Sequence, residues 1–141
     1  MSTSRPADLR GHALQFVKFT MVGGSGVFVN LAAFNATLIA WQLSTGHMGL
    51  TADYIANSLG FVVSVMTNYY LNRRWTFRST GRVTTEFPKF ATVSLAAYAV
   101  NLAIFTLAHT HFDLRGNVSQ LIAIASVLPV NYLANKFWSF R

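Results

Sequence analysis

The 141-residue chain contains no cysteine, so it has neither a disulfide framework nor thiol chemistry. It also has few charged residues, at 11% of the chain. An ordinary soluble domain has about 25% charged residues. A soluble domain of this size would need more ionic groups to cover its surface. The scarcity of charge therefore argues against an ordinary soluble domain.

Acidic residues are scarcer still, and there are only four: Asp8, Asp53, Glu86 and Asp113. None lies in the middle of an apolar stretch, whereas a proton-coupled exporter of similar size needs a carboxylate inside the membrane. The sequence also has no phosphate-binding Gly-rich loop and no grouping of nucleophile, base and orienting residue. We therefore expect no enzyme activity, no cofactor and no metal site.

The chain contains four long stretches without charged residues. No Asp, Glu, Lys or Arg occurs in residues 19–52, 54–72, 90–112 or 116–135. A membrane-spanning helix needs about 20 mostly apolar residues. The first stretch is long enough for one helix and part of a loop, and each of the others fits one helix. The sequence thus predicts an all-α membrane protein with four transmembrane helices, at residues 16–42, 54–73, 88–109 and 117–136.

The net charge of +7 is unevenly placed. All basic residues except Arg115 lie at or before the start of the first predicted helix, at or between the end of the second and the start of the third, or at the end of the chain. Four helices bring these three regions to one side, and the positive-inside rule makes that side the cytoplasm. We therefore expect both termini in the cytoplasm, with residues 1–15 as a short cytoplasmic segment. The charge then reflects topology, and we expect no nucleic-acid partner.

Two segments of the chain recur. NYYLNRRWTFR (residues 68–78) matches NYLANKFWSFR (131–141), and FVKFTMVGGSGVFVN (16–30) matches FPKFATVSLAAYAVN (87–101). The repeats are helical hairpins, 16–78 and 87–141. Two helices return a chain to its starting side, so both hairpins have the same orientation. We expect a parallel repeat about a two-fold axis along the membrane normal.

Each predicted helix carries a stripe of small and amide side chains. The amides are Asn30, Asn68, Asn72, Asn101, Asn131 and Asn135. Lipid offers no hydrogen bonds, so such amides should face protein or a cavity. For Asn30 and Asn101 two interpretations stay open. They bridge helices, or they face a polar substrate.

Cations follow the second and fourth predicted helices directly, as Arg73 and Arg74 and then as Lys136. They and the neighbouring Trp75 and Trp138 could simply anchor the helix ends at the membrane interface. Alternatively, the three cations form a cationic collar that binds the phosphate of a lipid, because guanidinium groups grip phosphate oxygens. In that case Arg73 and Arg74 should contribute most, since the second motif has Lys and Phe at their positions.

FVKFTMVGGSGVFVNLAAF at the first helix, the four-helix layout and NYYLNRRWTF at the second together resemble the GtrA-like family of small bacterial membrane proteins. The resemblance covers residues 16–141, which we take as one GtrA-like transmembrane domain. It implies a multi-pass protein of the bacterial cytoplasmic (inner) membrane.

The resemblance also implies a function, the flipping of a polyprenyl-phosphate-linked sugar across that membrane for cell-surface polysaccharide synthesis. The expected partners are this lipid, membrane lipid, a membrane glycosyltransferase and a second copy of the chain in a dimer. The cations and amides named above would bind the lipid phosphate and the sugar. The alternative is a scaffold that recruits or orients a glycosyltransferase without transport.

Overall fold

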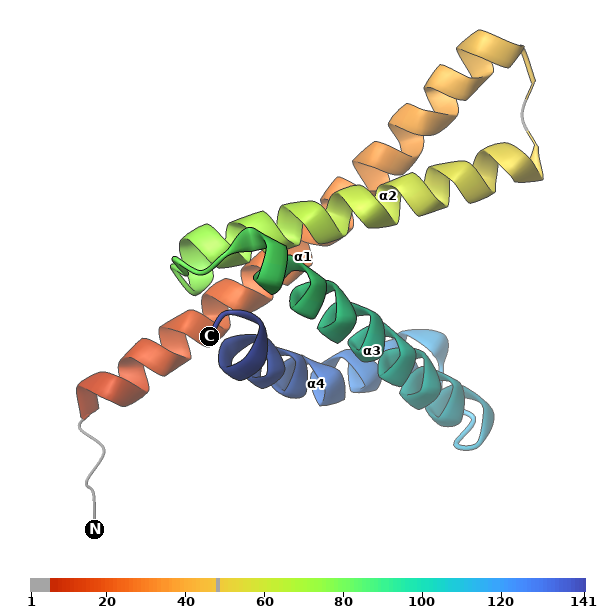
Figure 1. Cartoon of the computed structure of the whole chain (residues 1–141). Coiled ribbons are helices and arrows are strands. Elements are labelled where there is room, and N and C mark those ends of the chain that lie inside the picture. The colour runs from red at the N-terminus through yellow and green to blue at the C-terminus, as the bar shows by residue number, and fades with distance from the viewer. Residues whose placement is uncertain (1–5, 48) are drawn as a thin grey trace. The chain divides into compact units, whose positions relative to one another are not determined.

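The computed structural model describes residues 6–47 and 49–141, which contain helices and no strands. In chain order the helices are α1 (Pro6–Thr45), α2 (Leu50–Leu71), η1 (Asn72–Thr76), α3 (Val83–Thr110), α4 (Gly116–Ala134) and η2 (Asn135–Ser139) (Figure 1). The chain divides into two compact units, residues 1–78 and 79–141. Each unit is a helical hairpin, here called hairpin one and hairpin two. The prediction of an all-α protein with four long helices is confirmed.

Three helical segments are long and apolar enough to cross a membrane: Leu9–Thr45, Val83–Thr110 and Val118–Ser139. Within the described residues α2 does not meet this standard. Its 22 residues include Asp53 and several amides and hydroxyls, which lower its mean hydropathy. The fourth span and the cytoplasmic position of the termini stay predictions.

The described surface is the reverse of a soluble protein's surface. Large apolar side chains such as Leu43 and Phe28 are 82% and 75% exposed. The largest fully buried side chains are all polar: Glu86, Asn72, Asn135, Ser119 and Ser139. An apolar exterior suits contact with lipid. Lipid offers polar side chains no hydrogen bonds, so these side chains are more stable when they face other helices.

Helix α1 begins at Pro6, ten residues before the predicted start, and its 40 residues form one helix. Proline is compatible with a first helical turn because the amide hydrogen it lacks would have no helical partner there. At 1.5 Å per residue the helix is about 60 Å long, twice the thickness of a hydrocarbon core of about 30 Å. Residues 6–15 therefore continue the first helix, and their position in the cytoplasm stays a prediction.

The repeated motif continues α2 and α4 as a wider turn. The amide of Phe77 donates to the carbonyl of Asn72 at 2.8 Å, and the amide of Phe140 donates to Asn135 at 3.0 Å. Each bond spans five residues, which defines a π-helix. Elements η1 and η2 are these two π-helical turns, and they occupy matching positions in the motif.

Each π-helical turn packs against the first helix of its own hairpin. The rings of Phe19 and Phe77 meet edge-on in hairpin one, with centroids 6.0 Å apart. Those of Phe90 and Phe140 lie 5.7 Å apart in hairpin two. Both pairs join matching positions of the two repeats. The duplicated sequence thus forms the same local contact twice, while the symmetry relating the hairpins stays a prediction.

Candidate functional site

A groove runs between α1 and α2 in hairpin one, with a cavity of about 250 Å³. It is lined by Gly23, Gly26, Val27, Asn30, Leu31, Ser64 and Asn68, and we call it the amide groove. The hydroxyl of Ser64 donates to the carbonyl of Gly26 at 2.8 Å, which ties the two helices together across it. The structure thus brings together Asn30 and Asn68, two of the amides predicted from the sequence.

Two glycines let these amides approach the opposite helix. A Cβ atom added to Gly26 would lie 2.5 Å from Nδ2 of Asn68, and one added to Gly60 would lie 2.9 Å from the carbonyl oxygen of Asn30. Small residues at such crossings allow close backbone contact between membrane helices. The Oδ1 atom of Asn68 is buried and accepts no hydrogen bond from the described chain. A ligand hydroxyl that reached it would satisfy this acceptor.

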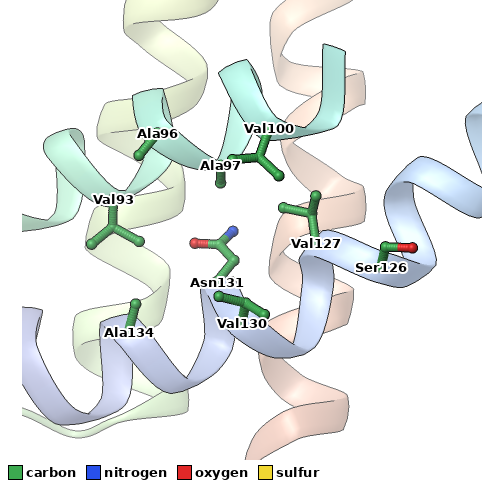
Figure 2. Close-up of a pocket in the computed structure, with 9 residues that line it drawn as sticks. All are labelled: Val93, Ala96, Ala97, Val100, Ser126, Val127, Val130, Asn131 and Ala134. Atoms are coloured by element: carbon green, nitrogen blue, oxygen red, sulfur yellow. The ribbon is translucent and has the colours of Figure 1, made fainter. Parts of the chain in front are cut away.

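The matching groove of hairpin two has different chemistry. Its cavity of about 200 Å³ is lined by Val93, Ala96, Ala97, Val100, Ser126, Val127, Val130, Asn131 and Ala134, and we call it the apolar groove. Figure 2 shows the Asn131 amide between the two helices, surrounded by aliphatic side chains. The repeat alignment pairs Ser64 with Val127, Asn68 with Asn131, and Asn30 with Asn101, which does not line this groove. One amide therefore remains in a lining that is otherwise mostly aliphatic.

The remaining predicted amides line neither the amide groove nor the apolar groove. Asn101 is half-buried on α3 and belongs to neither lining. Asn72 and Asn135 are enclosed at the start of the π-helical turns, and the Oδ1 atom of each is without a partner in the described chain. The Nδ2 group of Asn135 donates to both the carbonyl and the Oδ1 of Asn131, each at 2.9 Å. These two bonds join Asn135, the first residue of η2, to Asn131 in the lining of the apolar groove.

The predicted cations lie against aromatic rings. The Arg74 guanidinium lies 5.8 Å from the centre of the Tyr70 ring, and the Lys136 ammonium lies 5.5 Å from that of Tyr132. Lys136 also donates to the Tyr132 hydroxyl at 3.3 Å. Cation–π contacts of this kind hold a charged group near an interface without removing its charge. Arg73 is half-buried in η1. The cationic collar combines residues of both units and stays a prediction.

A comparison with protein families matches residues 18–140 to a model described as the GtrA/DPMS transmembrane domain. The chain belongs to this family. The resemblance noted from the sequence is thereby confirmed. Membership of the GtrA/DPMS family makes the chain a membrane protein and suggests a part in polysaccharide synthesis that uses polyprenyl-linked sugars. A comparison with curated proteins finds no significant match.

A second polar cavity, which the sequence analysis missed, lies at the start of the GtrA/DPMS region. It measures about 280 Å³ and is lined by Gly11, His12, Leu14, Gln15, Lys18 and Thr76, and we call it the entry pocket. The amide of Gln15 donates to the carbonyl of Thr76 at 3.2 Å. Treating residues 1–15 as separate from the first helix concealed this pocket, because only a continuous α1 carries His12 and Gln15 to η1.

Proposed function

We propose that the chain flips a polyprenyl-phosphate-linked sugar across the bacterial cytoplasmic membrane for cell-surface polysaccharide synthesis, and that it is not an enzyme. Family membership supports this class of lipid. The observation that carries translocation is the amide groove, where Asn30, Ser64 and Asn68 line a cavity between apolar helices. A sugar loses its hydrogen bonds to water when it enters a bilayer, and polar groups on its path replace them.

The difference between the grooves supports a sugar path in hairpin one. The amide groove is lined by two amides, Asn30 and Asn68, whereas the apolar groove is lined by one, Asn131. Each groove also has one serine, and both hydroxyls already donate to a backbone carbonyl at 2.8 Å. Each sugar hydroxyl left without a hydrogen-bond partner in the apolar groove would raise the free energy of the bound state by on the order of 1–3 kcal/mol. The prenyl chain has no such requirement and stays in the lipid.

The proposed topology has four spans, both termini in the cytoplasm and two parallel hairpins. We infer a dimer, because four helices form a thin wall around a sugar path. The sequence places no carboxylate inside a predicted span, so transport runs downhill. It is driven by synthesis of the lipid in the cytoplasm and consumption of the sugar outside, and a membrane glycosyltransferase is the partner that supplies the lipid.

Reconstitution into liposomes tests this function. The native chain should expose the sugar of a short-chain polyprenyl-phosphate sugar to an external reagent faster than protein-free liposomes do. Replacing Asn30 or Asn68 with Leu should slow exposure about tenfold, the effect of one or two lost hydrogen bonds. The Arg73→Ala, Arg74→Ala double variant tests the cationic collar in the same assay.

Asn35 gives a matched control. It is an exposed amide on α1 that donates to the carbonyl of Leu31 of its own helix at 2.7 Å. Asn35→Leu should therefore leave the rate unchanged. If the native chain moves no sugar lipid faster than protein-free liposomes do, across several sugars, the flipping proposal is wrong. The scaffold alternative would then account for the family association.

A further inference from the structure

The entry pocket gathers groups that suit an anion. Lys18 supplies a positive charge, Gln15 an amide, His12 an imidazole and Thr76 a hydroxyl. The Lys18 ammonium is held 5.3 Å from the centre of the Trp75 ring. A cation held in this way is already oriented, so less side-chain entropy is lost when an anion binds.

The Thr76 hydroxyl is an independent sign of a ligand. Thr76 is 5% exposed and lines the entry pocket, yet its Oγ1 has no hydrogen-bond partner in the described chain. A buried hydroxyl without a partner is costly, and a ligand can satisfy it. The matching Ser139 Oγ is also buried without a partner in the described chain, so the ligand is inferred at Thr76 because that residue shares a pocket with Lys18. A phosphate oxygen in the pocket would accept this hydrogen bond and face Lys18 at the same time.

The corresponding place in hairpin two is unsuited to an anion. The repeat alignment pairs Lys18 with Lys89 and Thr76 with Ser139, but it pairs Gln15 with Glu86 and His12 with Val83. Glu86 is 2% exposed and accepts a hydrogen bond from the Ser79 hydroxyl. A carboxylate at the position of the Gln15 amide repels phosphate. The difference in sequence therefore confines an anion site to hairpin one.

We propose that the entry pocket binds the phosphate group of a lipid at the membrane interface, with Lys18 as its cation and Thr76 as a hydrogen-bond donor. The neighbouring Trp75 is 41% exposed, as expected for a residue at headgroup depth. For the identity of the lipid this inference rests on the proposed function. It assigns the phosphate to a pocket formed by α1 and η1, and not to the cationic collar.

Equilibrium binding tests the pocket without requiring transport. The full-length chain in detergent is titrated with a short-chain prenyl phosphate, with the corresponding prenyl alcohol as the uncharged probe. The native chain should bind the phosphate and not the alcohol. Lys18→Gln should weaken binding about tenfold, as expected for a lost charge-assisted hydrogen bond. Lys89→Gln is the matched control from hairpin two and should change the affinity less than about twofold.

Thr76→Val separates binding from folding. Valine has a similar shape and removes a hydroxyl that has no partner in the described chain, so the melting temperature should stay the same or rise. Affinity for the prenyl phosphate should nevertheless fall, by about threefold to tenfold. Unchanged affinity in this variant would remove Thr76 from the site.

Three comparisons decide between the possibilities: the two lysine variants, competition with inorganic phosphate, and binding against transport. The proposed phosphate site would be wrong if Lys18→Gln and Lys89→Gln lost affinity equally, or if the native chain did not bind the prenyl phosphate. Displacement of the probe by inorganic phosphate at similar concentration would assign the pocket to free phosphate, and failure to displace it would assign it to a lipid headgroup. Normal transport by Lys18→Gln would contradict the proposed phosphate site and leave the flipping proposal standing. Lys18-dependent binding without transport would contradict flipping and leave the phosphate site standing.

Discussion

At the scale of single residues, hairpin one has two reciprocal contacts between an asparagine and a glycine. Asn68 of α2 lies against Gly26 of α1, and Asn30 of α1 lies against Gly60 of α2. Each amide reaches the opposite helix because the glycine there has no side chain. Asn30 therefore both contacts the partner helix and lines the amide groove, so the two interpretations open at the sequence level are compatible.

These contacts predict which glycines tolerate a methyl group. Gly60→Ala should destabilise the chain by about 1–3 kcal/mol, because the added Cβ meets the backbone oxygen of Asn30, which cannot rotate away. Gly23 has open space around its Cβ position, so Gly23→Ala should be neutral or stabilise α1 by up to about 1 kcal/mol. Unfolding in mixed detergent, followed by circular dichroism, measures both. Equal stability of the two variants would contradict the contact at Gly60.

The sequence predicted some of these residues and not others. The spacing of Asn30 and Asn68 along their helices is visible in the sequence, and it placed both amides on interior faces. The role of Thr76 was not visible, because its burial depends on the wider turn of η1 and on the early start of α1. Its recurrence as Ser139 was the available signal, since both positions carry a small hydroxyl residue.

At the scale of elements, the repeated motif builds a π-helical turn at the end of each hairpin. A π-helical turn contains more residues per turn than an α-helix, so it changes the direction of every side chain that follows. In both hairpins this change brings the last phenylalanine of the motif onto the first helix, as Phe19–Phe77 and Phe90–Phe140. The aromatic residue is thus retained in both copies of the motif for a contact within the hairpin.

Double-mutant cycles on the two aromatic pairs test this role. Replacing either ring with Leu should lower stability, and each pair should show a coupling free energy of about 0.5–1.5 kcal/mol, typical of edge-on aromatic contacts. Phe28 provides the control, because it is 75% exposed on α1. A cycle between Phe28 and Phe77 should give no coupling. Absence of coupling in both aromatic pairs would show that the π-helical turns are held by other contacts.

Helix number and type followed from the charge-free stretches, but the helix ends did not. Hydropathy marks the part of a helix that lies in lipid, and it says nothing about turns that continue into the interface. Helix α1 therefore began ten residues earlier than predicted. The π-helical turns were missed for a related reason, since five-residue hydrogen bonding leaves no periodic pattern in so short a segment.

At the scale of the whole molecule, two hairpins of matching sequence carry grooves that differ in polarity. Ser64 in the amide groove corresponds to Val127 in the apolar groove, so these two positions offer a direct exchange. Ser64→Val should slow sugar-lipid flipping about threefold to tenfold, because one hydrogen-bonding group is lost from the path. Val127→Ser should leave the rate unchanged. The liposome assay measures both, and a larger loss in the Val127 variant would move the sugar path to hairpin two.

The number of spans is the remaining property of the whole chain that can be tested directly. Among the long helices of the described chain, α2 is not a candidate span by length and hydropathy. Its crossing of the membrane decides whether hairpin one returns to its starting side. The native chain has no cysteine, so single cysteines can be labelled without background. Suitable exposed positions are Thr45 at the end of α1, Thr80 after η1 and Thr110 at the end of α3.

With four spans, a membrane-impermeant maleimide added to intact cells should label Thr45→Cys and Thr110→Cys. Thr80→Cys should react only after the membrane is opened. Labelling of Thr45 and Thr80 from the same side would instead place α2 along the interface, leaving three crossings and putting the two ends of the chain on opposite sides. The hairpins could then not be parallel repeats, because two complete hairpins require an even number of crossings. The amide groove would also be displaced from the membrane interior, so this labelling pattern would contradict the sugar path together with the topology.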